Sequence, residues 1–166
     1  GVSGAKGRDN SLALPSTTHL SIIDSAGNAV SMTTTIENGF GSLQMVRGFL
    51  LNNQLTDFSF TATDAAGNPI ANSVQPGKRP RSSMAPTIVF NAATGDLEGV
   101  VGSPGGSQII GYVAKTLVAL LDWKMDPQVA VDLGNFGSRN GPTELEKGTE
   151  AEAGKAALEA KGHEVR

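Results

Sequence analysis

Two neighbouring threonines, Thr17 and Thr18, stand where a segment without periodicity, Gly1–Ser16, meets a stretch of alternating residues. An amino-terminal threonine can act as a nucleophile without a histidine, because its own α-amino group has a pKa near neutrality and can accept the hydroxyl proton. This chemistry requires cleavage of the Ser16–Thr17 bond to free the amine. Threonine pairs are also common at the start of an ordinary strand, and the pair alone favours that interpretation.

The glycine-rich turn GSPGGSQ, Gly102–Gln108, is a second candidate, because it leads directly into an apolar helical pattern. Consecutive glycines allow backbone N–H groups to approach an oxyanion closely, and a helix start adds amides that point the same way. Alone, such a turn could also bind phosphate or nothing, although the P-loop lysine pattern is missing. An oxyanion site is preferred because it would act together with Thr17.

Two pairs of alternating segments, each pair joined by a turn sequence, predict two β-hairpins that would position these residues. The paired segments are His19–Asp24 with Ala29–Ile36, and Thr87–Phe90 with Leu97–Val101. Between the hairpins, Gly48–Asn53 reads as a short strand. The long polar stretch Gln54–Ser83 reads as a loop that lines a site, since loops of this length in a compact domain usually have a function.

Helical patterns dominate the second half of the chain. Apolar residues recur at helical spacing within Ile109–Asp122, a short helix is predicted from Pro127 to about Gly134, and Glu150–Lys161 is rich in Ala, Glu and Lys. The apolar residues of the first helix are Ile110, Val113, Leu117, Leu120 and Leu121. Hairpins followed by helices predict an α+β fold of antiparallel sheets with covering helices.

Composition restricts the classes of ligand. The 166 residues suit one domain, and the net charge of −3 gives no electrostatic case for nucleic acid or an anionic membrane. No apolar run is long enough to span a bilayer, and there is no cysteine. The two histidines, His19 and His163, are far apart, so we expect no metal site and no cofactor. The basic residues Lys78, Arg79 and Arg81 are interpreted as a solvated face.

Four separated blocks of the sequence resemble the small subunit of the γ-glutamyltranspeptidases, or glutathione hydrolases, of the N-terminal-nucleophile hydrolase superfamily. The blocks are PSTTHLSIIDSAGNAVSMTTTIENGFGS from Pro15, NNQLTDFS from Asn52, PGKRPRSSMAPTIV from Pro76 and GSPGGSQII from Gly102. The resemblance implies an αββα sandwich to which this chain contributes the nucleophile-bearing part. It also implies that residues 1–16 end the large-subunit region and that residues 17–166 form the small-subunit domain, truncated before the family's last strands.

The resemblance assigns roles to the candidate residues. It makes Thr17 the nucleophile and places the oxyanion hole at Gly105 and Gly106. Thr35 matches a threonine that hydrogen-bonds the amino-terminal region of the nucleophile. Without the family, Thr35 would be read as a solvated β-branched strand residue.

The same resemblance describes a site for the α-amino acid end of a γ-glutamyl substrate. Glu37, Gln54 and Asp57 match the positions that hold the α-ammonium group, although Asp57 alone could equally cap a turn. Ser82 and Ser83 match the paired serines that hold the α-carboxylate. The arginine that grips this carboxylate in the family belongs to the large subunit.

The activity implied is γ-glutamyl transfer or hydrolysis of glutathione-like amides, after self-cleavage at Ser16–Thr17. Its partners would be the large subunit of the same precursor, a γ-glutamyl substrate such as glutathione, and water or an amino acid or peptide as acceptor. A periplasmic or secreted location is implied as well. Three alternatives remain: an inactive precursor or fragment that acts only as an interaction subunit, a cephalosporin acylase, and a poly-γ-glutamate hydrolase. The isolated chain is expected to have little activity.

Overall fold

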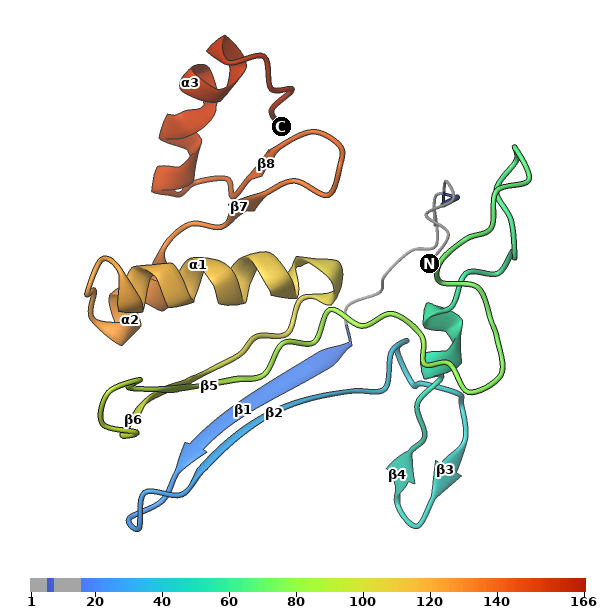
Figure 1. Cartoon of the computed structure of the whole chain (residues 1–166), viewed down its shortest axis with the longest axis horizontal. Coiled ribbons are helices and arrows are strands. Elements are labelled where there is room, and N and C mark those ends of the chain that lie inside the picture. Colours follow the sequence, from blue (N-terminus) through green and yellow to red (C-terminus); the bar gives the residue numbers. More distant parts are fainter. Residues whose placement is uncertain (1–5, 8–15) are drawn as a thin grey trace.

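The computed structural model of the chain describes residues 6–7 and 16–166. Most of the predicted leader, residues 1–5 and 8–15, lies outside the described residues. Within the described part, the chain is a mixture of short helices and four two-stranded antiparallel sheets. The predicted combination of antiparallel hairpins and helices is confirmed (Figure 1).

Both predicted hairpins form. The strands β1 (Thr17–Ile23) and β2 (Ala29–Thr35) pair so that Thr17 lies opposite Thr35. The strands β5 (Thr87–Phe90) and β6 (Leu97–Val101) form the second hairpin. The first turn is fixed locally, because the Asp24 carboxylate accepts hydrogen bonds from the backbone N–H groups of Ala26 and Asn28, both at 2.9 Å.

The helical half differs from expectation in its details. A single 3₁₀ turn, η2 (Gly106–Gln108), leads into α1 (Ile109–Leu121), and α2 covers Pro127–Asp132. The segment predicted as one helix, Glu150–Lys161, divides into the 3₁₀ helix η3 (Glu150–Gly154) and α3 (Lys155–Ala160). A short hairpin of β7 (Phe136–Gly137) and β8 (Glu144–Leu145) was not predicted, since two-residue strands leave almost no periodic signal.

The segment between the main hairpins is more ordered than a plain loop. Instead of one strand at 48–53, β3 (Met45–Val46) and β4 (Phe49–Leu50) form a small hairpin. The long stretch predicted as a loop begins with the 3₁₀ helix η1 (Gln54–Asp57) and then folds back on itself, with the N–H of Ile70 donating to the carbonyl of Ala62 at 2.9 Å. Phe58 and Ile70 are buried at its base.

A small core lies between β6 and the start of α1. Val101, Ile109 and Val113 are buried, and Met84, Ala85, Leu117 and Leu120 pack against them. The expected apolar face of the helix is therefore corrected at two positions, because Ile110 and Leu121 are 60% and 37% exposed. Ile109, Val113 and Leu117, spaced four apart, face the core, whereas Leu121 in the last turn of the helix does not.

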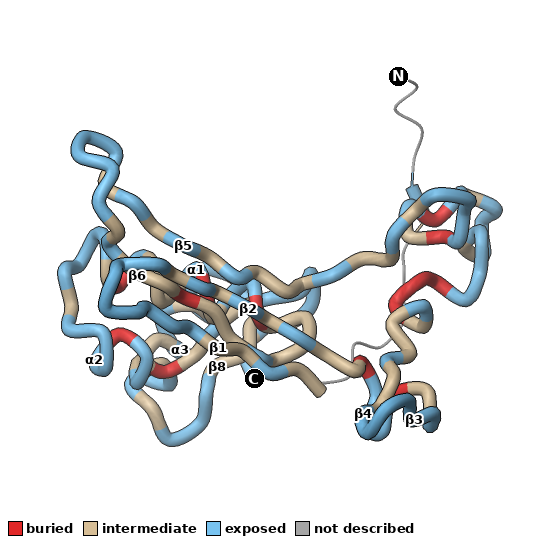
Figure 2. Tube along the Cα trace, turned by 90° about the horizontal axis from the view of Figure 1, so that it is seen from below, coloured by how far each residue is buried: buried red, intermediate tan, exposed pale blue. Residues whose placement is uncertain are grey.

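The first hairpin and α1 both contact β6, so the two hairpins and the helix form one assembly around it (Figure 1). The small sheets β3–β4 and β7–β8 lie to either side of that assembly (Figure 1). Buried residues are few and scattered along the tube in Figure 2. Among residues 6–7 and 16–166, no helix has the length and apolar character needed to cross a bilayer.

Candidate active site

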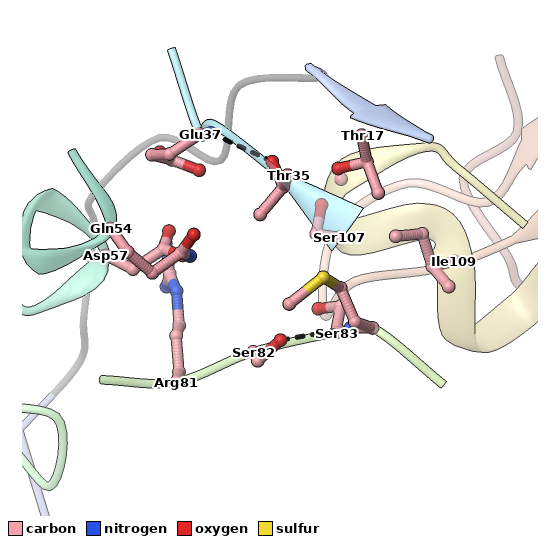
Figure 3. A pocket seen from close by; sticks show the side chains of 12 residues that line it. Thr17, Thr35, Glu37, Gln54, Asp57, Arg81, Ser82, Ser83, Ser107 and Ile109 are labelled. Carbon is pink, nitrogen blue, oxygen red and sulfur yellow. Dashed lines mark hydrogen bonds between the residues drawn. The ribbon is translucent and has the colours of Figure 1, made fainter. Parts of the chain in front are cut away.

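A pocket with about 370 Å³ of empty space, including the part that opens to solvent, lies where β1, β2, η1, η2 and the irregular segment before β5 meet. Eight of the nine predicted site residues line it: Thr17, Thr35, Glu37, Gln54, Asp57, Ser82, Ser83 and Gly106. The ninth, Gly105, precedes Gly106 in the same turn. Predicted residues separated by up to 89 positions in the sequence, from Thr17 to Gly106, are thus brought to one place (Figure 3).

The bond that would have to be cleaved lies at the edge of this pocket. The Thr35 hydroxyl donates a hydrogen bond to the carbonyl oxygen of Ser16 at 3.1 Å, and it accepts one from the N–H of Glu37 at 2.9 Å. Because the Glu37 N–H occupies a lone pair of the hydroxyl, the hydroxyl proton is left to point at the Ser16 carbonyl. Thr35 therefore polarises the carbonyl of the Ser16–Thr17 bond.

Two carboxylates occupy one end of the pocket (Figure 3). Glu37 and Asp57 are only 7% and 8% exposed, and the side-chain amide of Gln54 donates to Asp57. Burial, and then the nearby charge of Asp57, raise the pKa of Glu37, whereas the positive charge of Arg81 opposes this rise. An ammonium group placed between the two carboxylates would offset the free-energy cost of their desolvation and reduce the repulsion between them.

The backbone of Glu37 is also unusual, with φ of 70°. This left-handed conformation is unfavourable for a residue with a Cβ atom. It directs the carboxylate away from the line of β2, which ends at Thr35. Non-glycine residues in such conformations often occur at functional sites, where the surrounding structure holds them.

The basic run Lys78, Arg79 and Arg81 was interpreted as a solvated face. This interpretation is wrong for Lys78 and Arg81. Arg81 lines the pocket beside Ser82 and Ser83. The Lys78 ammonium donates to the carbonyls of Ala71 and Ser73, which ties this segment to the fold of residues 59–73. Only Arg79 of the run is exposed.

The glycine-rich turn forms the wall near Thr17. Gly105 and Gly106 have φ of 138° and 57°, and the N–H groups of Gly105, Gly106 and Ser107 stand at the start of the helical segment η2–α1. The first N–H groups of a helical segment have no acceptor within it, so they can bind a negative oxygen. A Cβ atom at Gly105 would approach the ring of Tyr112 to 2.7 Å, so the turn packs closely on α1.

His19 has a structural role beside the pocket. Its Nδ1 and the Thr33 hydroxyl are 2.8 Å apart, its Nε2 is 3.0 Å from the Ser21 hydroxyl, and its ring lies directly over Gly102. Burial lowers the pKa of His19, which favours the neutral ring. The histidine of the TTH motif therefore holds the first hairpin against the start of the glycine-rich turn.

Four further residues line the pocket without having been predicted: Arg81, Met84, Ser107 and Ile109. Arg81 and Ser107 adjoin predicted residues in the sequence, and Arg81 also belongs to the basic run beside the serine pair. Met84 and Ile109 contribute apolar surface and also belong to the core cluster or pack on it. Together the lining supplies a strand hydroxyl, two carboxylates, a guanidinium and backbone amides at a helix start. A hydroxyl and backbone amides are groups that acyl transfer can use, and the charged groups are suited to an amino acid.

Comparison with known proteins identifies one family, and the match extends over nearly the whole chain. The family model described as γ-glutamyltranspeptidase matches residues 3–166. The glutathione hydrolase proenzyme of Pseudomonas sp. (strain A14) is 43% identical over 130 residues, which are 72% of this chain and 22% of that protein. The putative inactive glutathione hydrolase 4 of Arabidopsis thaliana is 41% identical over 69% of this chain and 63% of its own length.

Solved structures resemble the chain as well. The crystal structure of a mutant γ-glutamyltranspeptidase from Helicobacter pylori superposes with a TM-score of 0.77 at 36% identity, covering 90% of this chain and 83% of that one. The chain belongs to the γ-glutamyltranspeptidase family. It spans about a fifth to a quarter of the length of the curated proenzymes that it matches first.

Proposed function

We propose that this chain is the nucleophile-bearing part of a γ-glutamyl transferase or hydrolase in which Thr17 becomes the amino-terminal nucleophile. The main support is the meeting of Thr17, an acidic end, a serine pair and an amide-rich turn in one pocket. These groups match the parts of a γ-glutamyl substrate: the γ-carbonyl, the α-ammonium and the α-carboxylate. Glutathione or a related amide is the proposed acyl donor.

Activation would begin with cleavage of the Ser16–Thr17 bond. The Thr17 hydroxyl oxygen attacks the Ser16 carbonyl carbon, which Thr35 polarises, while the hydroxyl proton passes to the departing nitrogen. The C–N bond breaks, and the Ser16 acyl group is left as an ester on Thr17. Water then hydrolyses this ester, which yields a Ser16 carboxylate and a Thr17 with a free hydroxyl and a free amine.

Turnover would use the same hydroxyl. Thr17 attacks the γ-carbonyl and its α-amine takes the proton, while the amides of Gly105 and Gly106 stabilise the tetrahedral oxyanion. The leaving amine receives the proton as its C–N bond to the acyl group breaks. Water or the amine of an acceptor then releases the γ-glutamyl group from Thr17.

Glu37, Asp57 and Gln54 are proposed to hold the α-ammonium, and Ser82 and Ser83 the α-carboxylate. Arg81 adds a positive charge to the pocket in this chain itself. The same proposal includes a partner that corresponds to the family's large subunit and completes an αββα sandwich. It also includes export from the cytoplasm. Exposed apolar side chains in the 40–60 segment, among them Phe40, Leu55 and Phe60 at 71 to 81% exposure, support a partner surface.

The experiment is expression of the full-length protein that contains this chain, followed by intact-mass measurement, amino-terminal sequencing and assay with a γ-glutamyl anilide. The proposal expects a chain beginning at Thr17 and release of the aniline, and the Thr17→Ala variant should give neither. Cleavage elsewhere, or anilide hydrolysis that survives in the Thr17→Ala variant, would rule the proposal out. Parallel assays with a cephalosporin and with poly-γ-glutamate separate the alternative acyl donors.

A second candidate is an inactive interaction subunit. Its support is the similarity to the Arabidopsis protein described as putatively inactive. An intact Ser16–Thr17 bond after prolonged incubation of the full-length protein would favour this candidate.

A further inference from the structure

A network of charged and polar side chains joins the β7–β8 hairpin to the glycine-rich turn. The Glu144 carboxylate on β8 accepts hydrogen bonds from the Gln108 side-chain amide at 3.0 Å and from Arg166 at 2.6 Å. It also accepts from Nη2 of Arg139, which lies 3.2 Å from both carboxylate oxygens. Glu144 is thus shared by three donors from separate parts of the chain.

Two of these donors bear directly on the candidate oxyanion site. Nη1 of Arg139 donates to the Ser107 hydroxyl at 2.8 Å, and Ser107 lines the active-site pocket. Gln108, bound by Glu144, is the next residue. The network therefore holds the two residues that directly follow Gly105 and Gly106.

External contacts can help to fix this turn, because two of its residues are consecutive glycines. Gly105 and Gly106, with φ of 138° and 57°, lack the Cβ atoms that restrict other residues. Within the turn, the Gln108 N–H donates to the Gly105 carbonyl at 3.1 Å. The direction of the glycine amides depends on where Ser107 and Gln108 are held.

We infer that Glu144 and Arg139 are positioning residues, which hold Ser107 and Gln108 so that the amides of Gly105 and Gly106 face the oxyanion. The inference rests on the proposed function. Glu144 and Arg139 act through the turn and lie outside the pocket lining. An amide displaced by about 1 Å stabilises the oxyanion poorly, and displacements of this size can slow catalysis by up to about a hundredfold.

The charge state and exposure of the network agree with this role. The hydrogen bond from Arg166 is the main cause that lowers the pKa of Glu144, with Gln108 and Arg139 contributing, so the carboxylate is charged throughout the neutral range. The side chains of Arg139 and Arg166 are 51% and 66% exposed. Ion pairs this exposed contribute little to global stability, so their main effect should be local.

The test uses the full-length protein with Glu144→Gln and Arg139→Lys as separate variants. Gln keeps the size of Glu144 without its charge, and Lys keeps the charge of Arg139 without the fork that reaches both partners. Glu159→Gln is the matched control, since Glu159 pairs with Lys155 at 3.9 Å on α3, in the same part of the chain. Each protein is assayed for kcat and KM with a γ-glutamyl anilide and for thermal unfolding.

A second readout separates positioning from general damage. A boronic acid analogue of glutamate forms a tetrahedral adduct with the nucleophile and places an oxygen at the oxyanion position, whereas glutamate itself does not. We expect kcat to fall about tenfold in both variants, KM to change by less than about twofold, and the affinity for the boronic acid to fall with kcat. Glutamate affinity and the control variant should be unchanged.

If the wild-type enzyme is active and both variants keep its kcat, the proposed function stands and the inference is overturned. Equal weakening of boronic acid and glutamate binding, or a loss of activity no larger than the loss of folded protein, would overturn it as well. A wild-type protein without γ-glutamyl hydrolysis would overturn the proposed function and the inference with it.

Discussion

At the scale of single residues, Glu37 combines burial, a left-handed backbone and a neighbouring carboxylate. Each of these features costs folding free energy, and none is needed to end a strand. The Thr35 hydroxyl links Glu37 to the Ser16 carbonyl through two hydrogen bonds. The residue that would bind substrate and the bond that would be cleaved are therefore held by the same side chain.

Replacing Glu37 by Gln should raise stability while weakening substrate binding. The raised pKa of Glu37 means that the folded chain binds this proton more tightly than the unfolded chain does. The ionised carboxylate therefore lowers the free energy of unfolding above its folded pKa, and this penalty disappears as the pH falls below its ordinary value of about 4.3. Thermal unfolding of Glu37→Gln should show a gain at pH 7 that shrinks toward pH 4.

Substrate affinity should change in the opposite direction. Loss of a charge-assisted contact to the α-ammonium, worth about 1.5 to 3 kcal/mol, should raise KM by roughly ten- to a hundredfold. The exposed carboxylate of Glu159 provides the control, and Glu159→Gln should alter neither quantity. A Glu37→Gln protein less stable than the wild type at pH 7 would contradict the assigned environment.

The sequence predicted which residues meet at the site better than it predicted how they meet. The hydroxyl and carboxylate residues could be proposed because the family motifs mark them. Arg81 was missed because a basic run is usually solvated, and its inward place depends on the approach of residues 81–84 to η1, which no local pattern encodes. The polarised Ser16 carbonyl depends on the strand register, which placed Thr17 opposite Thr35.

At the scale of elements, the long hairpins were predictable because alternation and the turn sequences between the strands are local signals. Asp64 repeats the pattern of Asp24, accepting from the N–H groups of Ala66 and Asn68 at 2.9 Å. The pKa of each carboxyl is lowered mainly by a hydrogen bond from the side-chain amide of the asparagine four residues on, and then by that residue's backbone N–H. The β7–β8 hairpin and the 3₁₀ start of the last helix were not predictable in this way, because tertiary contacts hold them. Thr143 and Leu145, for example, pair with Glu164 and Arg166.

The contact between the first hairpin and the glycine-rich turn gives a prediction for Gly102. A methyl group at Gly102 would collide with the His19 ring, which the Thr33 and Ser21 hydroxyls hold in place. Gly102→Ala should therefore shift the turn, lower kcat by at least about tenfold and destabilise the fold by about 1 to 3 kcal/mol.

Gly27 provides the comparison for the steric effect, because nothing lies within 4 Å of a Cβ there, although its φ of 84° adds strain to any substitution. Gly27→Ala should lower stability without lowering kcat. The double substitution His19→Ala/Gly102→Ala removes the imidazole ring with which the new methyl group would collide. It should therefore recover part of the activity lost in Gly102→Ala. A double variant no better than the single one would show that the collision is not the cause.

At the scale of the whole molecule, the described part of the chain buries little apolar surface. Seven apolar residues are buried, while large side chains on β1, β2 and the 40–60 segment are exposed. Leu43 and Phe60, at 80% and 81% exposure, are the extremes. A surface of this kind is typical of an interaction site.

The isolated 166-residue chain should therefore self-associate and have little activity. Sedimentation over a range of concentrations should show oligomers, and anilide hydrolysis should be far below that of the full-length protein. Leu43→Lys with Phe60→Lys should reduce the association without lowering the unfolding temperature, since both side chains are already exposed. A monomeric isolated chain with full activity would refute the need for a partner.

The most direct test of the account is to trap the acyl group on its nucleophile. Full-length protein is mixed with a slowly hydrolysed γ-glutamyl ester, quenched in acid and digested, and its peptides are analysed by tandem mass spectrometry. We predict a peptide that begins at Thr17 and carries one γ-glutamyl group on the Thr17 hydroxyl. A γ-glutamyl group on any other side chain, or an unmodified Thr17 in an enzyme that turns over, would contradict it.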